Sequence, residues 1–97
     1  MQVMIRYKLS PDDVKQDLEL LRDVFDELDS VQPEGLRYAT FQLDDEVTFV
    51  SFVELAEGPQ MMRHLQAFQR YRATLDARCA ETPVTTVLRE VGAYRFH

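Results

Sequence analysis

Histidine is the side chain that changes charge near neutral pH, and this chain of 97 residues contains two, His64 and His97. His64 precedes Phe68 by four residues and Tyr71 by seven, a spacing that places the three side chains on one face of a helix. A histidine beside aromatic rings can orient a phenolic ligand or transfer a proton, so His64 is the candidate catalytic residue. The alternative is a partly buried histidine that is hydrogen-bonded to a carbonyl group or to Tyr71. His97, the last residue, is interpreted as a frayed end or a cloning remnant rather than a ligand.

Aromatic residues on the predicted strands and on the second predicted helix are the candidates for ligand contacts. Together they could form the wall of a pocket for a small apolar or aromatic molecule. The alternative is that these rings fill the edge of the core while the tyrosine hydroxyl groups reach water, which is the more common arrangement. The candidate ligand-binding residues are Tyr7, Tyr38, Phe49, Phe68 and Tyr71.

Several other kinds of chemistry are not indicated by the sequence. Two histidines and one cysteine, without a Cys-x-x-Cys or His-x-x-x-His spacing, do not predict a zinc site. The three glycines are isolated, so no phosphate-binding loop is predicted. A net charge of −6, with scattered basic residues, argues against nucleic-acid binding. We therefore expect no metal, no cofactor and no nucleic-acid partner, and we interpret Cys79 as a small buried apolar side chain.

The elements that would position these side chains follow from alternating apolar residues and from two prolines. Proline suits the first turn of a helix, and Pro11 and Pro59 each stand at the start of a predicted helix. The opposite face of the first helix is acidic and is interpreted as solvated. Its apolar stripe is predicted to consist of Val14, Leu18, Leu21, Phe25 and Leu28. The predicted strands cover residues 2–8, 36–43, 47–54 and most of 84–97, and the predicted helices cover 11–28 and 59–80.

The order β-α-β-β-α-β predicts an α+β fold of the ferredoxin-like type, with an antiparallel sheet that carries both helices on one face. We expect residues 1–97 to form a single domain. In residues 47–53, apolar side chains stand at both odd and even positions, which point to opposite faces of a strand. Both faces of that strand should therefore be covered. In a chain this short, a second copy is the simplest cover for the face without helices, and we expect a homodimer to which Tyr94 and Phe96 contribute.

No apolar run approaches the roughly 20 residues of a membrane span. The first residues contain no basic region followed by a long apolar stretch, so no signal peptide is predicted. We expect a cytoplasmic protein that has no membrane partner.

Three segments together resemble a known family. Residues 5–11 resemble the opening strand of that family and its helix start at a proline. Residues 51–54 resemble a strand that ends in an acidic residue. Residues 63–71 resemble a helix with an early histidine that is followed by aromatic residues. The family is that of the antibiotic biosynthesis monooxygenase-like proteins of the dimeric α+β barrel superfamily. The resemblance implies two sheets paired face to face and a ligand between each sheet and its own helices.

Known activities in this family include cofactor-free oxidation of polycyclic aromatic compounds and oxidative haem breakdown. The members that degrade haem use an asparagine, a tryptophan and a histidine of the second helix, whereas this chain contains neither asparagine nor tryptophan. Only His64 therefore corresponds to a functional residue of the family.

Two hypotheses about function follow. The first is a small-molecule-binding protein, in its most specific form a cofactor-independent monooxygenase-like enzyme that acts on an aromatic or polyketide-like compound. The second is a non-catalytic homodimeric module for binding or structure. Fold alone does not separate them. A cavity of a few hundred Å³ that His64 and a tyrosine hydroxyl group both face would favour the first.

Overall fold

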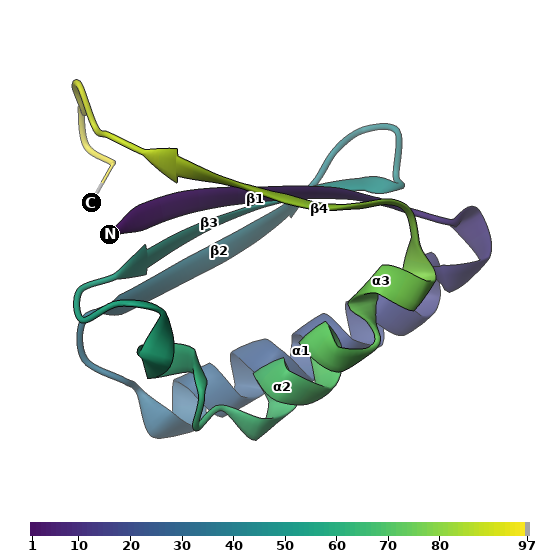
Figure 1. Cartoon of the computed structure of the whole chain (residues 1–97), viewed down its shortest axis with the longest axis horizontal. Coiled ribbons are helices and arrows are strands. Elements are labelled where there is room, and N and C mark those ends of the chain that lie inside the picture. The colour runs from purple at the N-terminus through teal and green to yellow at the C-terminus, as the bar shows by residue number, and fades with distance from the viewer. Residues whose placement is uncertain (97) are drawn as a thin grey trace.

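The computed structural model describes residues 1–96 and has two layers, a four-stranded sheet and a layer of helices on one face of it (Figure 1). All neighbouring strands are antiparallel, in the spatial order β2-β3-β1-β4, which confirms the predicted ferredoxin-like fold. Within the described residues, no helix combines the length and the apolar character that crossing a membrane requires. The strands are β1 (Gln2–Leu9), β2 (Leu36–Gln42), β3 (Thr48–Leu55) and β4 (Cys79–Leu88); the α-helices are α1 (Val14–Val31), α2 (Gln66–Ala73) and α3 (Leu75–Arg78); the 3-10 helices are η1 (Pro11–Asp13) and η2 (Pro59–Met62).

The second predicted helix, residues 59–80, is broken into η2, α2 and α3, so the prediction of one continuous helix is wrong. The backbone of Thr74, between α2 and α3, is not helical (φ −113°, ψ 5°). Cys79 begins β4 rather than ending a helix, because its backbone pairs with Leu9 of β1. Pairing with β1 satisfies the backbone groups of this segment, although the apolar spacing is also compatible with a helix. Pro83 falls inside this edge strand, where a proline is tolerated.

The end of the last predicted strand is also different in the structure. The chain leaves the sheet after Leu88, and residues 91–96 are not a strand. Val91, Tyr94 and Phe96 are 89%, 81% and 77% exposed. Three large apolar side chains are therefore presented to the outside of a single copy of the chain.

The apolar stripe of α1 is shifted by about one residue from the prediction. Leu18, predicted to be inside, is 43% exposed, whereas Asp17 is completely buried together with Leu21 and Val24. The prediction for Leu18 is wrong because the helix is rotated so that Asp17 meets hydrogen-bond partners on β1 and α3. A buried carboxylate is stable only when such partners exist.

Glu27 lies on the acidic face of α1, which the sequence predicts to be solvated, and for this residue the prediction is wrong. Its carboxylate accepts hydrogen bonds from the backbone N–H groups of Gln66 (3.0 Å) and Ala67 (2.9 Å). These are the first two residues of α2, whose N–H groups have no partner within the helix. Glu27 therefore caps α2 from a neighbouring helix and ties the two helices together, and its negative charge lies at the favourable end of the helix dipole.

The face of the sheet without helices is largely apolar on β2 and β3. Phe41 and Phe52 lie edge to face with ring centroids 6.0 Å apart and are 52% and 42% exposed. On the same face, Arg37 and Glu54 form an ion pair at 3.2 Å. We call this surface the outer face.

Candidate functional site

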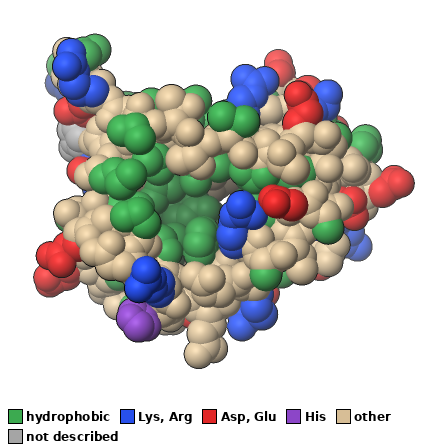
Figure 2. All heavy atoms as spheres, viewed as in Figure 1, with side chains coloured by type: hydrophobic (Ala, Val, Ile, Leu, Met, Phe, Trp, Pro, Cys, Tyr) green, Lys and Arg blue, Asp and Glu red, His purple; other side chains and the backbone are tan. Residues whose placement is uncertain are grey.

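Hydrophobic side chains line a hollow between the sheet and the helices, which the surface view shows from the side (Figure 2). The buried core is divided into two clusters, one around Tyr7 and Phe49 and the other around Val3 and Val53. Four residues pack against both clusters and are still only partly buried, namely Ile5, Leu28, Tyr38 and Phe68. The two clusters are therefore joined by residues that are not completely buried. We call this region the sheet–helix hollow.

The hollow is open along β4. Val3 of β1 is 6% exposed and faces the helices, whereas Val87, its partner on β4, is 68% exposed. Directly paired residues of antiparallel strands point to the same side of the sheet, so both valines face the helix layer. The helices therefore cover β1 and leave the helix side of β4 uncovered.

All five predicted ligand-binding residues lie on the helix side of the sheet or on α2, in two groups of ring contacts that a hydrogen bond between the hydroxyl groups of Tyr71 and Tyr7 joins. Tyr7 and Phe49 stack in parallel at 5.5 Å, and Phe68 contacts both Tyr38 (6.3 Å) and Tyr71 (6.1 Å). Tyr7, Phe49 and Tyr71 are buried, while Tyr38 and Phe68 are partly buried. The structure thus brings the set together, and its assignment to ligand binding stays a prediction.

His64 is not part of this group. It lies in the turn between η2 and α2 and is exposed, so the prediction that it shares a helical face with Phe68 and Tyr71 is wrong. Leu65 has an extended backbone (φ −91°, ψ 97°) and α2 begins only at Gln66. Because Met62 and Leu65 fill the core from this turn, the histidine between them is left outside. His97 lies outside the described residues.

A buried polar network crosses the core beside these aromatic rings. The Tyr71 hydroxyl donates a hydrogen bond to the Tyr7 hydroxyl (2.7 Å), and the Tyr7 hydroxyl donates to Oδ2 of Asp17 (2.9 Å). Nε and Nη2 of Arg78 both lie 2.9 Å from Oδ1 of the same carboxylate. Asp17 and Arg78 are 0% and 3% exposed, so this is a buried ion pair with additional hydrogen bonds rather than a surface contact.

Burial governs the protonation of this network. It raises the pKa of Tyr7 and of Tyr71 far above the usual tyrosine value, and the neighbouring carboxylate of Asp17 adds to both increases. Burial also raises the pKa of Asp17, while the hydrogen bonds from Tyr7 and Arg78 oppose that increase. Both tyrosines are therefore neutral hydroxyl groups, available as hydrogen-bond partners rather than as bases.

Asp17 and Arg78 are the residues of this region that the sequence analysis missed. Their signal was a charged residue at an inward position of a helical stripe. Asp17 stands three residues after Val14 and four before Leu21, and Arg78 stands three residues after Leu75. Two opposite charges at inward positions indicate a buried pair.

Metal binding has no support in the described part of the chain. No three His, Cys, Asp or Glu side chains among residues 1–96 are placed to hold a metal ion. The buried carboxylate of Asp17 already receives hydrogen bonds from Tyr7 and Arg78 on both oxygens.

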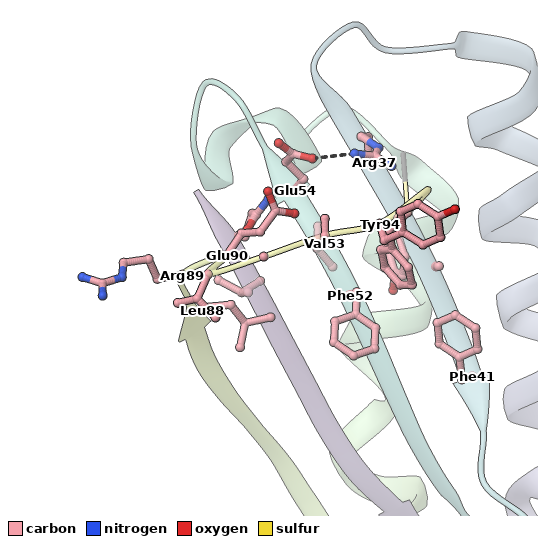
Figure 3. Close-up of a pocket in the computed structure, with 17 residues that line it drawn as sticks. Arg37, Phe41, Phe52, Val53, Glu54, Leu88, Arg89, Glu90 and Tyr94 are labelled. Carbon is pink, nitrogen blue, oxygen red and sulfur yellow. Dashed lines mark hydrogen bonds and ion pairs between the residues drawn. The ribbon is translucent and has the colours of Figure 1, made fainter.

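A second recess lies on the outer face, beneath the C-terminal segment (Figure 3). It encloses about 600 Å³ between the sheet and residues 88–96. Figure 3 shows this segment crossing the ends of the strands so that Tyr94 lies near β2, while Arg89 points away. Phe41 and Phe52 form its apolar floor. This recess has the size of a ligand site, but it is bounded on one side by an exposed segment that is not part of the sheet.

Comparison with known proteins identifies similar structures but no close relative. No protein-family model matches the sequence, and no curated protein gives a significant match. The crystal structure of an antibiotic biosynthesis monooxygenase has a TM-score of 0.71 and 17% identity, covering 94% of this chain and 98% of that chain. A conserved protein from Methanosarcina mazei Go1 has a TM-score of 0.74 and 15% identity, covering 92% of this chain and 90% of that chain. The protein NE2512 of unknown function from Nitrosomonas europaea has a TM-score of 0.70 and 14% identity, covering 96% of this chain and 90% of that chain.

The likeness extends over nearly the whole chain and confirms the fold resemblance found in the sequence. The fold defines a class of small ferredoxin-like α+β proteins that includes structures named as antibiotic biosynthesis monooxygenases. At these identities the likeness concerns the fold, and function has to be argued from the site.

Proposed function

We propose that this protein binds a small apolar or aromatic molecule in the sheet–helix hollow. The observation that carries the proposal is the divided core, in which Ile5, Tyr38 and Phe68 contact both clusters and are still partly exposed. Pockets for small molecules combine apolar walls with a few polar groups.

The finer proposal is that binding serves a cofactor-independent monooxygenase-like reaction on an aromatic or polyketide-like compound. In such a reaction a substrate carbon that carries two hydrogens in its keto form loses a proton, and the resulting carbanion reacts with dioxygen to give a hydroperoxide. Loss of water from the hydroperoxide, with the second hydrogen of that carbon, leaves a carbonyl group, so the substrate itself supplies the electrons that reduce the other oxygen atom. A base near the ligand would assist the first step. His64 is exposed in a turn and the network tyrosines have raised pKa values. The acidity of the substrate itself must therefore supply most of the reactivity, and binding without turnover is the second candidate function.

Ligand titration with a matched pair of variants tests the binding site. Val87→Phe adds volume on the helix side of β4, where the hollow opens. Val84→Phe adds the same volume to the same strand on the opposite side of the sheet, where Val84 is paired with Arg6 and is 63% exposed. We use 2-naphthol as the probe and follow backbone amide shifts by NMR.

Wild type should show shifts around Ile5, Phe68 and Val87, and Val87→Phe should weaken binding at least tenfold while Val84→Phe leaves it unchanged. Shifts confined to Phe41 and Phe52 would move the ligand site to the outer face and contradict the proposal. Oxygen consumption with an air-sensitive polyphenol separates turnover from simple binding.

We further propose that two copies of the chain associate through the outer face. The support is the apolar surface of Phe41 and Phe52 together with the exposed residues Val91, Tyr94 and Phe96, which one copy leaves uncovered. Exposed apolar surface of this kind marks interfaces. A permanent homodimer of this type should bury about 2,000 Å² or more in total.

Sedimentation analysis with another matched pair tests this association. Phe52→Glu puts a charge on the outer face, and Leu18→Glu puts one on α1 at nearly the same exposure, 42% against 43%. The first variant should sediment as a monomer and the second as the wild-type dimer. Removal of residues 91–97 should also weaken the dimer. A monomeric wild type at micromolar concentration would refute the proposal.

A further inference from the structure

The segment between β3 and α2 is attached to the rest of the protein at few points. Figure 1 shows it crossing from the sheet to the helix layer at one end of the molecule. We call residues 57–65 the strap. We propose that the strap opens as a unit while the rest of the fold stays closed, and that Glu27 is the latch that holds it shut. This inference goes beyond the proposed function, because it concerns a motion of the chain and holds with or without a ligand.

The hydrogen bonds of the strap are local. Four of its backbone N–H groups donate to carbonyl oxygens only three residues earlier, at 3.1–3.3 Å, namely those of Gly58, Met61, Arg63 and Leu65. The side-chain amide of Gln69 in α2 donates to the carbonyl oxygen of Met62 at 2.9 Å. Within the described residues, no hydrogen bond ties the strap to α1, β1, β2 or β4. Hydrogen bonds between near neighbours can stay formed while the strap moves, so they do not resist its opening.

Two buried side chains and one helix cap hold the strap in place. Met62 and Leu65 are 8% and 3% exposed and pack in the second core cluster, with Val3 and Val53. Where the strap joins α2, Leu65 supplies no side-chain cap to that helix. The carboxylate of Glu27 does so instead, since its two oxygens accept from the first two N–H groups of α2. These two groups directly follow Leu65, so withdrawal of Leu65 from the core breaks their hydrogen bonds to Glu27.

The other end of the strap contains a glycine. Gly58 has φ 95° and ψ 179°, a conformation that residues with a side chain rarely adopt. A Cβ atom at this position would lie 2.7 Å from Oε1 of Gln60. Glycine has more alternative backbone conformations than any other residue, so the chain can turn here with little strain. The strap therefore has a hinge at Gly58 and a latch at Glu27.

Opening of the strap would enlarge the sheet–helix hollow. Val3 packs in the same cluster as Met62 and Leu65, and its partner on β4, Val87, is already 68% exposed. Withdrawal of the two strap side chains would uncover Val3 and join its surface to the opening along β4. Exposure of this apolar surface costs free energy, so the closed form predominates. A segment with so few attachments opens at a lower free energy than the whole fold.

Labelling of buried thiol groups tests the proposal. Cys79 is first replaced by alanine, and one cysteine is then introduced either in the strap, Leu65→Cys, or in α1, Leu21→Cys; the two leucines are 3% and 6% exposed. Leu65→Cys should react about tenfold faster or more, and its rate should hardly change in dilute urea. The rate of Leu21→Cys should rise steeply with urea, because global unfolding exposes far more surface than local opening.

A matched pair of substitutions tests the latch. Glu27→Ala should accelerate the labelling of Leu65→Cys about fivefold, the effect of losing one helix cap. Asp26→Ala, at the exposed neighbouring residue, should leave that rate unchanged. Equal effects of the two substitutions would show that Glu27 is not the latch. Equal rates and equal urea dependence for the two cysteines would show that the strap opens only when the whole protein unfolds. Either result would overturn the proposal.

Wild type allows a measurement without any substitution. The amide hydrogens of Gln66 and Ala67, which donate to Glu27, should exchange with solvent by the local opening. Their exchange should be faster and less dependent on urea than that of Leu9, whose amide donates to the carbonyl oxygen of Val47 at 2.8 Å. The same opening free energy and urea dependence for all three amides would contradict the proposal, even if the cysteine variants fold poorly.

Discussion

Replacement of Arg78 by methionine is the most direct test of the buried network. Met fills similar volume along the side chain but leaves the carboxylate of Asp17, 0% exposed, without its positive partner. The variant loses two close N···O contacts of 2.9 Å to Oδ1, and only the hydrogen bond from Tyr7 to Oδ2 remains. Breaking a buried ion pair by removing one partner costs about 3–5 kcal/mol, because a buried charge is left uncompensated. We expect a loss of that size in the free energy of unfolding.

The loss should depend on pH in a defined direction. Burial already raises the pKa of Asp17, and removing Arg78 takes away an interaction that opposes this increase. A carboxyl group whose pKa is raised in the folded protein is favoured there in its protonated form. The destabilisation should therefore be smallest below the unfolded pKa of about 3.9 and should grow as the pH rises through the folded value. The variant should therefore come closest to wild type below about pH 3.9.

Urea unfolding followed by circular dichroism, at one fixed protein concentration, measures these differences. Asp17→Leu and the double variant Asp17→Leu/Arg78→Met complete a double-mutant cycle. The double variant should be more stable than either single variant, since it leaves no unpaired charge. A loss below about 1 kcal/mol for Arg78→Met, which is typical of exposed pairs, or additive losses in the cycle, would refute the reasoning.

Three further predictions concern single residues. Phe49→Ala should cost about 3–5 kcal/mol in urea unfolding, because the ring is 1% exposed and a cavity would remain; a cost below about 1 kcal/mol would mean that the core is not packed around it. Glu27→Ala should cost about 1 kcal/mol through loss of the cap on α2, while the exposed neighbour Asp26→Ala should change little; equal effects of both variants would argue against the cap. The pKa of Asp45 lies below the usual value because the side chain and the backbone of Thr48 donate hydrogen bonds to its carboxylate. In the variant Thr48→Val, carbon-detected NMR titration should therefore give a higher pKa for Asp45. An unchanged pKa would disprove this cause.

The sequence by itself determined the order of the elements and the face that each strand turns inward. Alternation places Tyr7 of β1 and Phe49 of β3 on one side of the sheet, and the two side chains are indeed stacked. Proline at residues 11 and 59 marked the points where the chain leaves a strand for a helical segment. These signals are local, because each depends on residues a few positions apart, and for this reason they could be read without knowing the fold.

Tertiary structure decided the rotation of α1 and the length of the second helical segment. A stripe that contains Leu18 and one that contains Asp17 are both compatible with helical spacing. Intrinsic preference favours leucine inside, since burying a carboxylate without partners is costly. Arg78 supplies the missing partner from 61 residues away, so the spacing within α1 alone does not reveal the contact.

The same reason explains the position of His64. Its spacing to Phe68 and Tyr71 would have placed it in the site on a continuous helix, but the turn at Leu65 separates it from α2. That turn persists because Met62 and Leu65 are buried and because Glu27 caps the helix that follows. All of these contacts join segments that are distant in sequence, and their combined free energy exceeds the small preference of a short segment to continue as a helix.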